Sequence, residues 1–506
     1  MRRKTHPIAN VANGMDVSLD PVLLLDTALP NARGVRFDGG LIKKDFGLTT
    51  TFGSNMSNTV LGFDTLYLSS GSEYLCAFTT NQFYSYDSVN SNFVSRNANF
   101  TGGLDDQFDS VSTVDANGND MIIVTNGKDP AKKWTGSGNC SNLGGVANVT
   151  FKYVVPYMSR LIIGYVTEGG TTSPRRIKWS AVGNPEDFTL ANGGGISEML
   201  DTPDFLSGLK LLRDRLFIFK EQSIWELSYV GSPKIFEPRM IVEKIGTVAP
   251  KSIVSMGDRL IFFGNDNVYA FDGAQLEPIA KQMVPVFFDS ETSIVTVGKL
   301  NRACGRAIKE LNQYWLSLPV EGSTLPNRLY KYDFNSNAWA WQNYDITALA
   351  AFQGGAAGMP WNVDANTWAN EVGIWRSSNL ASNAPVIVAG SNTGQCYQDD
   401  RQHFSNHTML FRTKSWTFGR SHRIMEMRVQ AKGGPFAMRY SLDEGNSFAG
   451  GTTFGYQANF VEFAMPINKT TQHLLVEVKS TANTFELKWM DPWFIDRTRS
   501  KSIVTS

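Results

Sequence analysis

The chain has 506 residues, of which 42% are hydrophobic and 12% aromatic, and this length predicts several domains or one large repeat architecture. Its 47 Lys and Arg residues equal its 47 Asp and Glu residues, and this balance argues against a protein that grips nucleic acid over a wide face. No apolar run approaches the roughly 18 residues of a membrane span or forms a signal-peptide core, so we expect a protein made in a cytoplasm, with no membrane span.

Residues 1–55 are expected to form an extended N-terminal arm that ends in a first strand. They show little helical periodicity, and Asp-Pro, Leu-Pro and Asp-Gly-Gly turns interrupt them. The phrase GLIKK at residues 40–44 predicts the start of a strand. Such an arm can close a repeat architecture on itself or clasp a neighbouring subunit, and the sequence favours neither.

A hairpin pattern recurs through residues 56–402. Its clearest copy, DRLIFFGNDNVYAFDG, has two apolar and aromatic runs joined by a Gly-Asn-Asp-Asn turn. About seven copies follow one another at intervals of roughly 40 to 70 residues, which is typical of propeller blades. They lie at residues 74–87, 121–136, 160–180, 215–228, 258–273, 313–334 and 386–399.

We therefore predict an all-β chain whose residues 56–402 form a β-propeller of about six to eight blades. The inner runs are almost continuously apolar, as expected for strands covered on both faces. Two β-sandwiches in series are the alternative, and residues 335–385 fit either a loop excursion or a degenerate blade. Aromatic residues of a size suited to the wedges between blades occur on the second strand of several copies: Tyr84, Trp134, Trp179, Trp225, Tyr269 and Tyr332.

Residues 403–506 are predicted to form a separate C-terminal β-sandwich of about six to eight strands, because their apolar and polar residues alternate. The residues from 497 onward are polar and are expected to be frayed. The predicted strands lie near residues 416–418, 425–429, 436–440, 460–464, 474–478 and 485–489.

The phrase YSLDEGNSF at residues 440–448 matches the Asp box of sialidases and other propellers. We interpret it as a structural turn, in which Asp443 accepts backbone N–H groups, Gly445 takes the left-handed conformation and Phe448 tucks under. The motif occurs once and outside the repeats. A sialidase would also need an arginine cluster, a tyrosine nucleophile and an acid around one pocket.

No motif predicts a metal, a cofactor or a catalytic centre. His403 and His407 are four residues apart, but the intervening residues resemble a linker and no H-E-x-x-H is present. Neither a G-x-S-x-G elbow nor a phosphate-binding loop occurs. Because catalytic motifs are missing, we expect no enzymatic activity. The four cysteines are widely spaced, so we expect free thiols and an absence of disulfides and zinc.

Basic residues form only short, scattered clusters, such as Arg175 and Arg176 with Lys178. These are expected to be solvated faces or subunit contacts, and any that line a channel would contact phosphates without sequence preference. Two loops are candidates for gate or partner contacts, because surface loops on rigid sheets carry function. They are residues 167–174 and residues 351–370, the second of which contains Trp361 and Trp368.

Several phrases together resemble the tail nozzle proteins of short-tailed bacteriophages, also called tail tubular protein B. The resemblance covers most of the chain, and its motifs are structural phrases, not catalytic signatures. This chain is shorter than the larger members, which puts their docking platforms for fibres or spikes in doubt. The phrases are the arm at residues 14–47, RRIKWSAVGNPEDF at 175–188, IGTVAPKSIVSMGDRLIFFGNDNVYAFDG at 245–273, and FGRSHRIMEMRVQ with MRYSLDEGNSF at 418–448.

The resemblance implies a structural virion protein. About six copies would form a ring below the head-to-tail adaptor, above tail fibres, spikes or a needle. The ring would retain the packaged genome and let double-stranded DNA pass without sequence recognition. A neutral composition suits such sliding, because a strongly basic lumen would grip DNA.

Two other classes stay open. One is a carbohydrate-active or glycan-binding propeller similar to sialidases, and the other is a cellular scaffold that binds peptides on the top face of the propeller. A pocket with converging carboxylates and stacked tryptophans would favour the glycan class. A wide channel that forms only on oligomerisation would favour the nozzle.

Overall fold

The repeated hairpins form the middle of four-stranded antiparallel units. In the copy at residues 258–273, β23 (Leu260–Phe263) pairs with β24 (Val268–Phe271), and every residue of both strands is buried. The other six predicted hairpins are also present, as β7–β8, β11–β12, β15–β16, β19–β20, β27–β28 and β31–β32. The hairpin prediction is therefore confirmed.

The computed structural model describes residues 3–5, 13–352, 385–399 and 407–495. Six units are separate four-stranded sheets, and a seventh, β26 to β29, is continuous with the C-terminal strands. The first three are β6 (Val60–Tyr67), β7 (Glu73–Thr79), β8 (Phe83–Asp87) and β9 (Asn92–Ser95); β10 (Asp109–Val114), β11 (Asp120–Thr125), β12 (Lys132–Trp134) and β13 (Ser141–Asn142); and β14 (Val149–Tyr157), β15 (Arg160–Glu168), β16 (Thr171–Trp179) and β17 (Gly195–Glu198).

The next four units follow in chain order. Their strands are β18 (Leu206–Leu212), β19 (Arg215–Lys220), β20 (Ser223–Gly231) and β21 (Ile235–Glu243); β22 (Val254–Ser255), β23, β24 and β25 (Leu276–Pro278); β26 (Cys304–Ile308), β27 (Gln313–Leu318), β28 (Arg328–Asp333) and β29 (Ala338–Asn343); and β30 (Ile346–Phe352), β31 (Val386–Ser391), β32 (Cys396–Asp399) and β5 (Leu48–Thr51).

Helical segments among the described residues are short and lie in the connections between strands. They are α1 (Val284–Phe287), η1 (Leu190–Asn192), η2 (Pro250–Ser252), η3 (Lys281–Met283), η4 (Val297–Arg302) and η5 (Lys309–Leu311).

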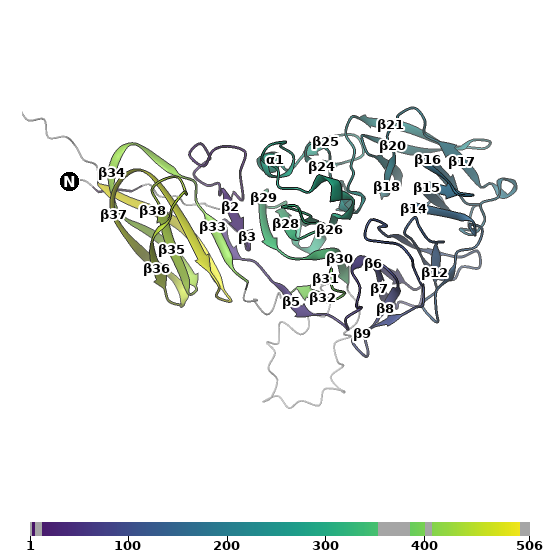
Figure 1. The fold of residues 1–506 in the computed structure, drawn as a ribbon, viewed down its shortest axis with the longest axis horizontal. Helices are drawn as coiled ribbons and strands as arrows, with labels where there is room; N and C mark the ends of the chain where they lie inside the picture. The colour runs from purple at the N-terminus through teal and green to yellow at the C-terminus, as the bar shows by residue number, and fades with distance from the viewer. Residues whose placement is uncertain (1–2, 6–12, 353–384, 400–406, 496–506) are drawn as a thin grey trace, which may run out of the picture.

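The units are arranged radially, with the first strand of each nearest the axis (Figure 1). Aromatic residues fill the wedges between them, as predicted. Trp179 and Trp225 share one buried cluster between the third and fourth units, and Trp134 packs with Phe78 and Phe83 between the first and second. Because neighbouring units cover both faces of each sheet, the apolar runs are continuous. The fold is a propeller, not two sandwiches in series.

The N-terminal arm closes the propeller. β5 (Leu48–Thr51) pairs antiparallel with β32 and completes the last unit, so the two ends of the repeat region meet within one sheet. Leu48 is buried there against Trp315 and Ile387. Of the two roles that the sequence left open for the arm, the structure shows closure.

The C-terminal strands form a strongly bent sheet with two layers. Six of them, β33 to β38, lie in residues 403–506, within the predicted number, but their bounds differ: β34 (Trp416–Gly433) spans the first two predicted strands, and β37 (Gln457–Ser480) spans the fourth and fifth. The long strands bend, and the two halves of β37 pair with different partners. The other strands are β33 (Met409–Arg412), β35 (Phe436–Ser441), β36 (Ala449–Phe454) and β38 (Phe485–Ile495), joined by β1 (Arg3–Thr5), β3 (Val35–Asp38) and β4 (Leu41–Lys44) from the arm.

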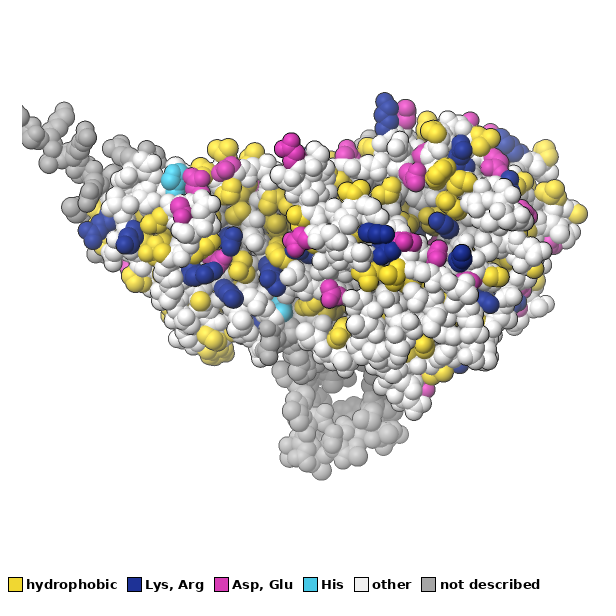
Figure 2. All heavy atoms as spheres, viewed as in Figure 1, with side chains coloured by type: hydrophobic (Ala, Val, Ile, Leu, Met, Phe, Trp, Pro, Cys, Tyr) yellow, Lys and Arg dark blue, Asp and Glu magenta, His cyan; other side chains and the backbone are white. Residues whose placement is uncertain are grey.

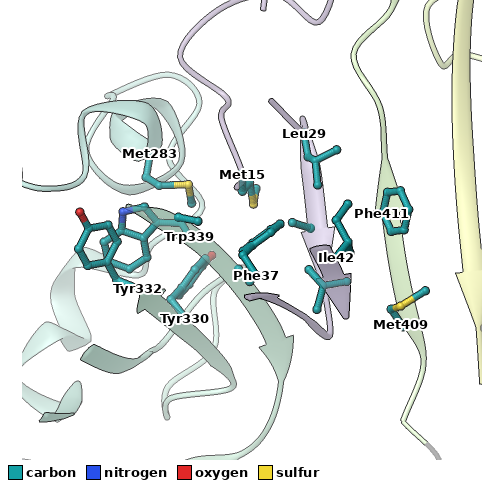
Figure 3. Close-up of a cluster of buried hydrophobic side chains, with 14 of the residues drawn as sticks. Met15, Leu29, Phe37, Ile42, Met283, Tyr330, Tyr332, Trp339, Met409 and Phe411 are labelled. Atoms are coloured by element: carbon teal, nitrogen blue, oxygen red, sulfur yellow. The ribbon is translucent and has the colours of Figure 1, made fainter. Parts of the chain in front are cut away.

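The arm also joins the propeller to the C-terminal strands. β2 (Asn31–Arg33) pairs in parallel with β29 on one side and antiparallel with β33 on the other, which makes one continuous sheet. In Figure 3, Met15 and Phe37 lie on the side of the propeller aromatics, whereas Leu29 and Ile42 lie toward Phe411. All belong to one buried cluster. The hydrophobic core is therefore shared between the two bodies.

Leu48→Ala is expected to lower the free energy of unfolding by about 2 to 4 kcal/mol, because it leaves a cavity where the closing strand packs. Thr51→Ala, at an exposed position of the same strand, should stay within about 0.5 kcal/mol of the wild type. Urea denaturation of both variants measures the difference. Equal effects would contradict a closing role for the Leu48 side chain.

Candidate functional site

A polar cavity of about 470 Å³ lies at the axis of the propeller. Its walls include residues of β6, β10, β18, β22, β26 and β30, the inner strands of the blades. The volume falls in the range of about 300 to 1,000 Å³ that is usual for small-molecule sites. Seven charged residues line it: Asp64, Asp109, Glu310, Lys210, Lys251, Arg306 and Lys309.

Asp109 forms the centre of the charge network. One of its oxygens accepts the backbone N–H of Val154 at 3.0 Å, and the other lies 3.4 Å from the Lys251 ammonium and 3.9 Å from that of Lys210. Burial lowers the pKa of Lys251; Asp109 opposes this shift and Lys210 adds to it. Two ammonium groups thus share one carboxylate that is only 10% exposed.

The second aspartate of the cavity is also held by hydrogen bonds. Asp64 accepts the Ser110 hydroxyl at 2.7 Å and the backbone N–H of Thr65 at 2.8 Å. No tryptophan occurs among the described residues that line the cavity. The stacked tryptophans that would favour the glycan-binding class are therefore not among these residues.

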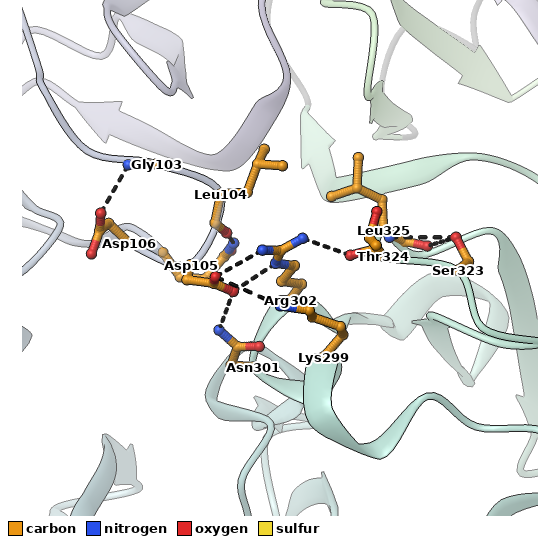
Figure 4. Close-up of polar contacts among 11 residues, drawn as sticks. Gly103, Leu104, Asp105, Asp106, Lys299, Asn301, Arg302, Ser323, Thr324 and Leu325 are labelled. Carbon is orange, nitrogen blue, oxygen red and sulfur yellow. Dashed lines mark hydrogen bonds and ion pairs between the residues drawn. The ribbon is translucent and has the colours of Figure 1, made fainter.

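A smaller cavity of about 80 Å³ adjoins the first and shares Asp109, Lys210 and Lys251 with it. Asp105 and Asn301 line this smaller cavity together. Asp105 precedes the second blade and Asn301 precedes the sixth, so segments from different sides of the ring meet here (Figure 4). The contact bridges the blades across this end of the axial space.

Arg302 makes the strongest part of this bridge. Its Nε and Nη2 atoms donate to the two oxygens of Asp105 at 2.7 and 2.8 Å, and Nη1 donates to the Thr324 carbonyl at 2.8 Å. Asn301 adds a bond of 2.9 Å to the same carboxylate. Arg302, followed by Asn301, holds the pKa of Asp105 well below its usual range. The bidentate geometry fixes the bridge in one orientation.

The predicted basic cluster lies elsewhere, on the third blade. Arg176 pairs with Glu198 on the neighbouring strand and with Glu168, and Lys178 lies 3.1 Å from Glu168. These are cross-strand ion pairs, which stabilise sheets modestly. Arg175 is half-buried one residue before them. The structure does not bring this cluster to the axial cavity, and its role as a partner contact stays a prediction.

The prediction of a long loop at residues 167–174 is wrong. Residues 167–174 are not a long loop between blades, because β15 and β16 continue up to a tight turn within the third blade. Gly169 and Gly170 form that turn with φ of 58° and 81°, values that glycine adopts without strain. The second loop begins at the end of β30. Most of it, with Trp361 and Trp368, lies outside the described residues.

The Asp-box phrase is a hairpin turn, as predicted. Asp443 accepts the backbone N–H of Ser447 at 2.9 Å, and Gly445 has φ of 97°. Hydrogen bonds from Ser441 and Ser447 lower the pKa of Asp443 to about 2. Phe448 is half-buried below the guanidinium groups of two arginines, Arg412 and Arg439, which both pair with the buried Glu477.

His407 is half-buried at the junction of the arm and the C-terminal strands, and His403 lies outside the described residues. Burial, aided by Lys44 and Lys331 and opposed by Asp45, lowers the pKa of His407 to about 4. Within the described ranges, no group of three or more His, Cys, Asp or Glu side chains is placed to hold a metal ion. The helices described are all too short or too polar to cross a membrane. The cysteines carry free thiols: Cys76, Cys140, Cys304 and Cys396.

Sequence reasoning missed the residues of the axial cavity. Lys210, Lys251 and Arg306 stand singly in the sequence and outside the basic clusters, although Lys251 lies within the phrase at residues 245–273. Their position in the repeat could have revealed these residues. Each lies on or just before the first strand of a blade, the strand nearest the axis. A charged residue at such a position points to a polar axis once the blade pattern is assigned.

Arg302→Gln is expected to destabilise the chain by about 1 to 2 kcal/mol, less than a fully buried pair because Asp105 is 54% exposed. Lys299→Gln is the matched control, since Lys299 lies 3.9 Å from the same carboxylate and donates no hydrogen bond to it. Thermal denaturation and limited proteolysis of residues 101–108 measure the effect. An equally large loss of stability in Lys299→Gln would show that the effect comes from charge alone and not from the hydrogen bonds of Arg302.

Stability is expected to fall as the pH drops from about 6.5 toward about 4, because the unfolded chain protonates His407 before the folded chain does. The contribution is complete above the ordinary histidine pKa of 6.5. His407→Asn should flatten this part of the pH profile of the urea midpoint. An unchanged slope in the variant would show that His407 is not its source.

Comparisons with family models and with curated proteins find no match. Among solved structures, the chain is similar to a catalytically inactive virginiamycin B lyase from Staphylococcus aureus with quinupristin, at a TM-score of 0.39 and 10% identity over 70% of this chain and 99% of that one. It is also similar to the AfRom2 CNH domain, with a TM-score of 0.37 and 8% identity over 70% and 98% of the chains. The C-terminal WD40 domain of Sif2 gives 0.35 and 10% over 70% and 97%. At these values the likeness says nothing about activity.

Proposed function

We propose that the chain is a structural protein of a bacteriophage tail, a nozzle or hub of which about six copies form a ring below the head-to-tail adaptor. In the virion the ring retains the packaged genome and forms the channel through which double-stranded DNA leaves. Tail fibres, spikes or a needle attach below it. The chain is made in the host cytoplasm and is not an enzyme.

The observation that carries the proposal is the double role of the arm, the first of the phrases that resemble the nozzle family. β5 closes the propeller, and β2, β3 and β4 belong to the sheet of the C-terminal strands. The two bodies therefore share backbone hydrogen bonds and a hydrophobic core. Such a rigid joint suits a channel component that must hold a packaged genome.

The size of the axial cavity supports a channel between copies. A space of about 470 Å³, bridged at one end by the Arg302–Asp105 pair, accommodates a small molecule and not a DNA duplex. A lumen for DNA would then form only where several chains meet around a common axis. In a cyclic ring each such interface joins two different faces.

Exposed apolar side chains are available to form these interfaces. Leu23 and Leu25 are each 68% exposed and Leu19 is 54% exposed, all on the turn of the arm before β2. Apolar residues gathered on a surface commonly mark protein contacts. On the face shown in Figure 2, Lys and Arg occur over both bodies with Asp, Glu and apolar residues between them. This mixed surface suits assembly between like subunits.

The purified chain is expected to form rings of about six copies, alone or on addition of adaptor and tail parts, when its mass is measured in solution and large species are imaged by negative stain. Leu23→Asp should weaken the ring and leave the melting temperature of the monomer unchanged, because the side chain is exposed. Val89→Asp, on a side chain 89% exposed in the first blade, is the control.

A chain that stays monomeric under every condition would contradict the proposal. Screening of sialosides and other glycans by the same monomer would then test the rival class. Saturable binding of a glycan, together with an absence of rings, would favour the glycan-binding propeller.

A further inference from the structure

Four cationic side chains line the axial cavity, against three carboxylates. Arg306, on β26, lines the cavity and is half-buried, yet its guanidinium group makes no hydrogen bond or ion pair with any described residue. A guanidinium group carries five N–H donors and cannot lose its charge in a protein. Partly buried donors without acceptors cost free energy, so the group needs water or a ligand.

The two lysines of the cavity add to this excess. Lys251 has one contact with Asp109, at the long distance of 3.4 Å, and Lys210 has only a 3.9 Å approach to the same carboxylate. Their side chains are 25% and 33% exposed, which leaves their ammonium groups accessible from the cavity. One carboxylate cannot neutralise two cations. Burial is the main cause of the lowered pKa of Lys251, and the neighbouring Lys210 adds to it.

Two of the three carboxylates that line the cavity are already engaged, and the third, Glu310, is exposed. Asp64 holds the Ser110 hydroxyl and a backbone N–H, and Asp109 holds the backbone N–H of Val154. The hydrogen-bonding groups that still lack a partner in the cavity are therefore donors on its cationic side chains. A compact anion with several oxygen atoms would accept charge-assisted hydrogen bonds from them.

We propose that the larger axial cavity binds a small anion that carries phosphate or carboxylate groups, held by Arg306, Lys251 and Lys210. The volume of about 470 Å³ suits a molecule of metabolite size. Arg306 supplies a planar fork that matches two oxygens of one group, and the two lysines supply point charges. The site lies within one chain and does not depend on the proposed assembly.

Isothermal titration calorimetry of the full chain at low chloride tests the site, with sodium phosphate and citrate as separate probes. Saturable binding at one site per chain is expected for at least one probe, and the preferred probe distinguishes a phosphate from a carboxylate ligand. Arg306→Gln should weaken binding about tenfold or more, since it removes charge-assisted hydrogen bonds. Lys210→Gln should weaken binding as well. Because the ion pair of Lys210 with Asp109 is long, at 3.9 Å, this substitution should leave the fold intact.

Lys281→Gln is the matched control, because Lys281 is exposed, lies outside the cavity and makes no ion pair among the described residues. It should bind like the wild type, and circular dichroism and melting curves verify the fold of all three variants. The absence of saturable binding of either probe up to about 10 mM, a range that covers weak millimolar sites, would overturn the proposal. So would equal affinity in the wild type, Arg306→Gln and Lys210→Gln.

Discussion

The closing of the propeller by a strand from the start of the chain is the constraint on which the rest of the structure depends. A ring of blades has no free edge only if its last sheet is completed, and β5 supplies the missing strand beside β32. The residues just before β5 are thereby held beside the propeller, and β2 to β4 continue the C-terminal sheet from there. One short arm thus fixes both the ring and the position of the second body.

The blades divide apolar and polar residues between different regions. Trp134, Trp179 and Trp225 occupy the wedges, where neighbouring sheets cover both faces. Near the axis the inner strands do not fill the space between them, and charged residues and water can occupy it. Asp109 and Arg302 show the two outcomes there: a carboxylate shared between cations, and a guanidinium whose donors are taken by Asp105 and the Thr324 carbonyl. The axis is consequently the polar part of an otherwise apolar interior.

Local features of this fold could be predicted from the sequence, and non-local ones could not. The seven hairpins could be predicted because the apolar runs and turn residues of each copy lie within about 20 positions of one another in the sequence. The strand bounds of the C-terminal body were predicted wrongly because β34 and β37 each continue through two predicted strands, without turn residues strong enough to end a strand. The partners of the arm and the residues of the axial cavity depend on contacts between distant segments. Arg306 has no motif around it, and only the assembled ring brings it near Lys251.

The use of the first strands to finish the last blade also has a consequence for folding. Leu48 donates a backbone hydrogen bond to the Tyr344 hydroxyl, which lies 296 residues further along the chain. During synthesis the arm is made first, yet its partners in β32 and β33 leave the ribosome near the end. Contacts of such long range slow folding, and the unpaired strand edges stay exposed in the meantime. Completion of the ring therefore waits until β32 has been made, and the incomplete chain is the form most open to mispairing between copies.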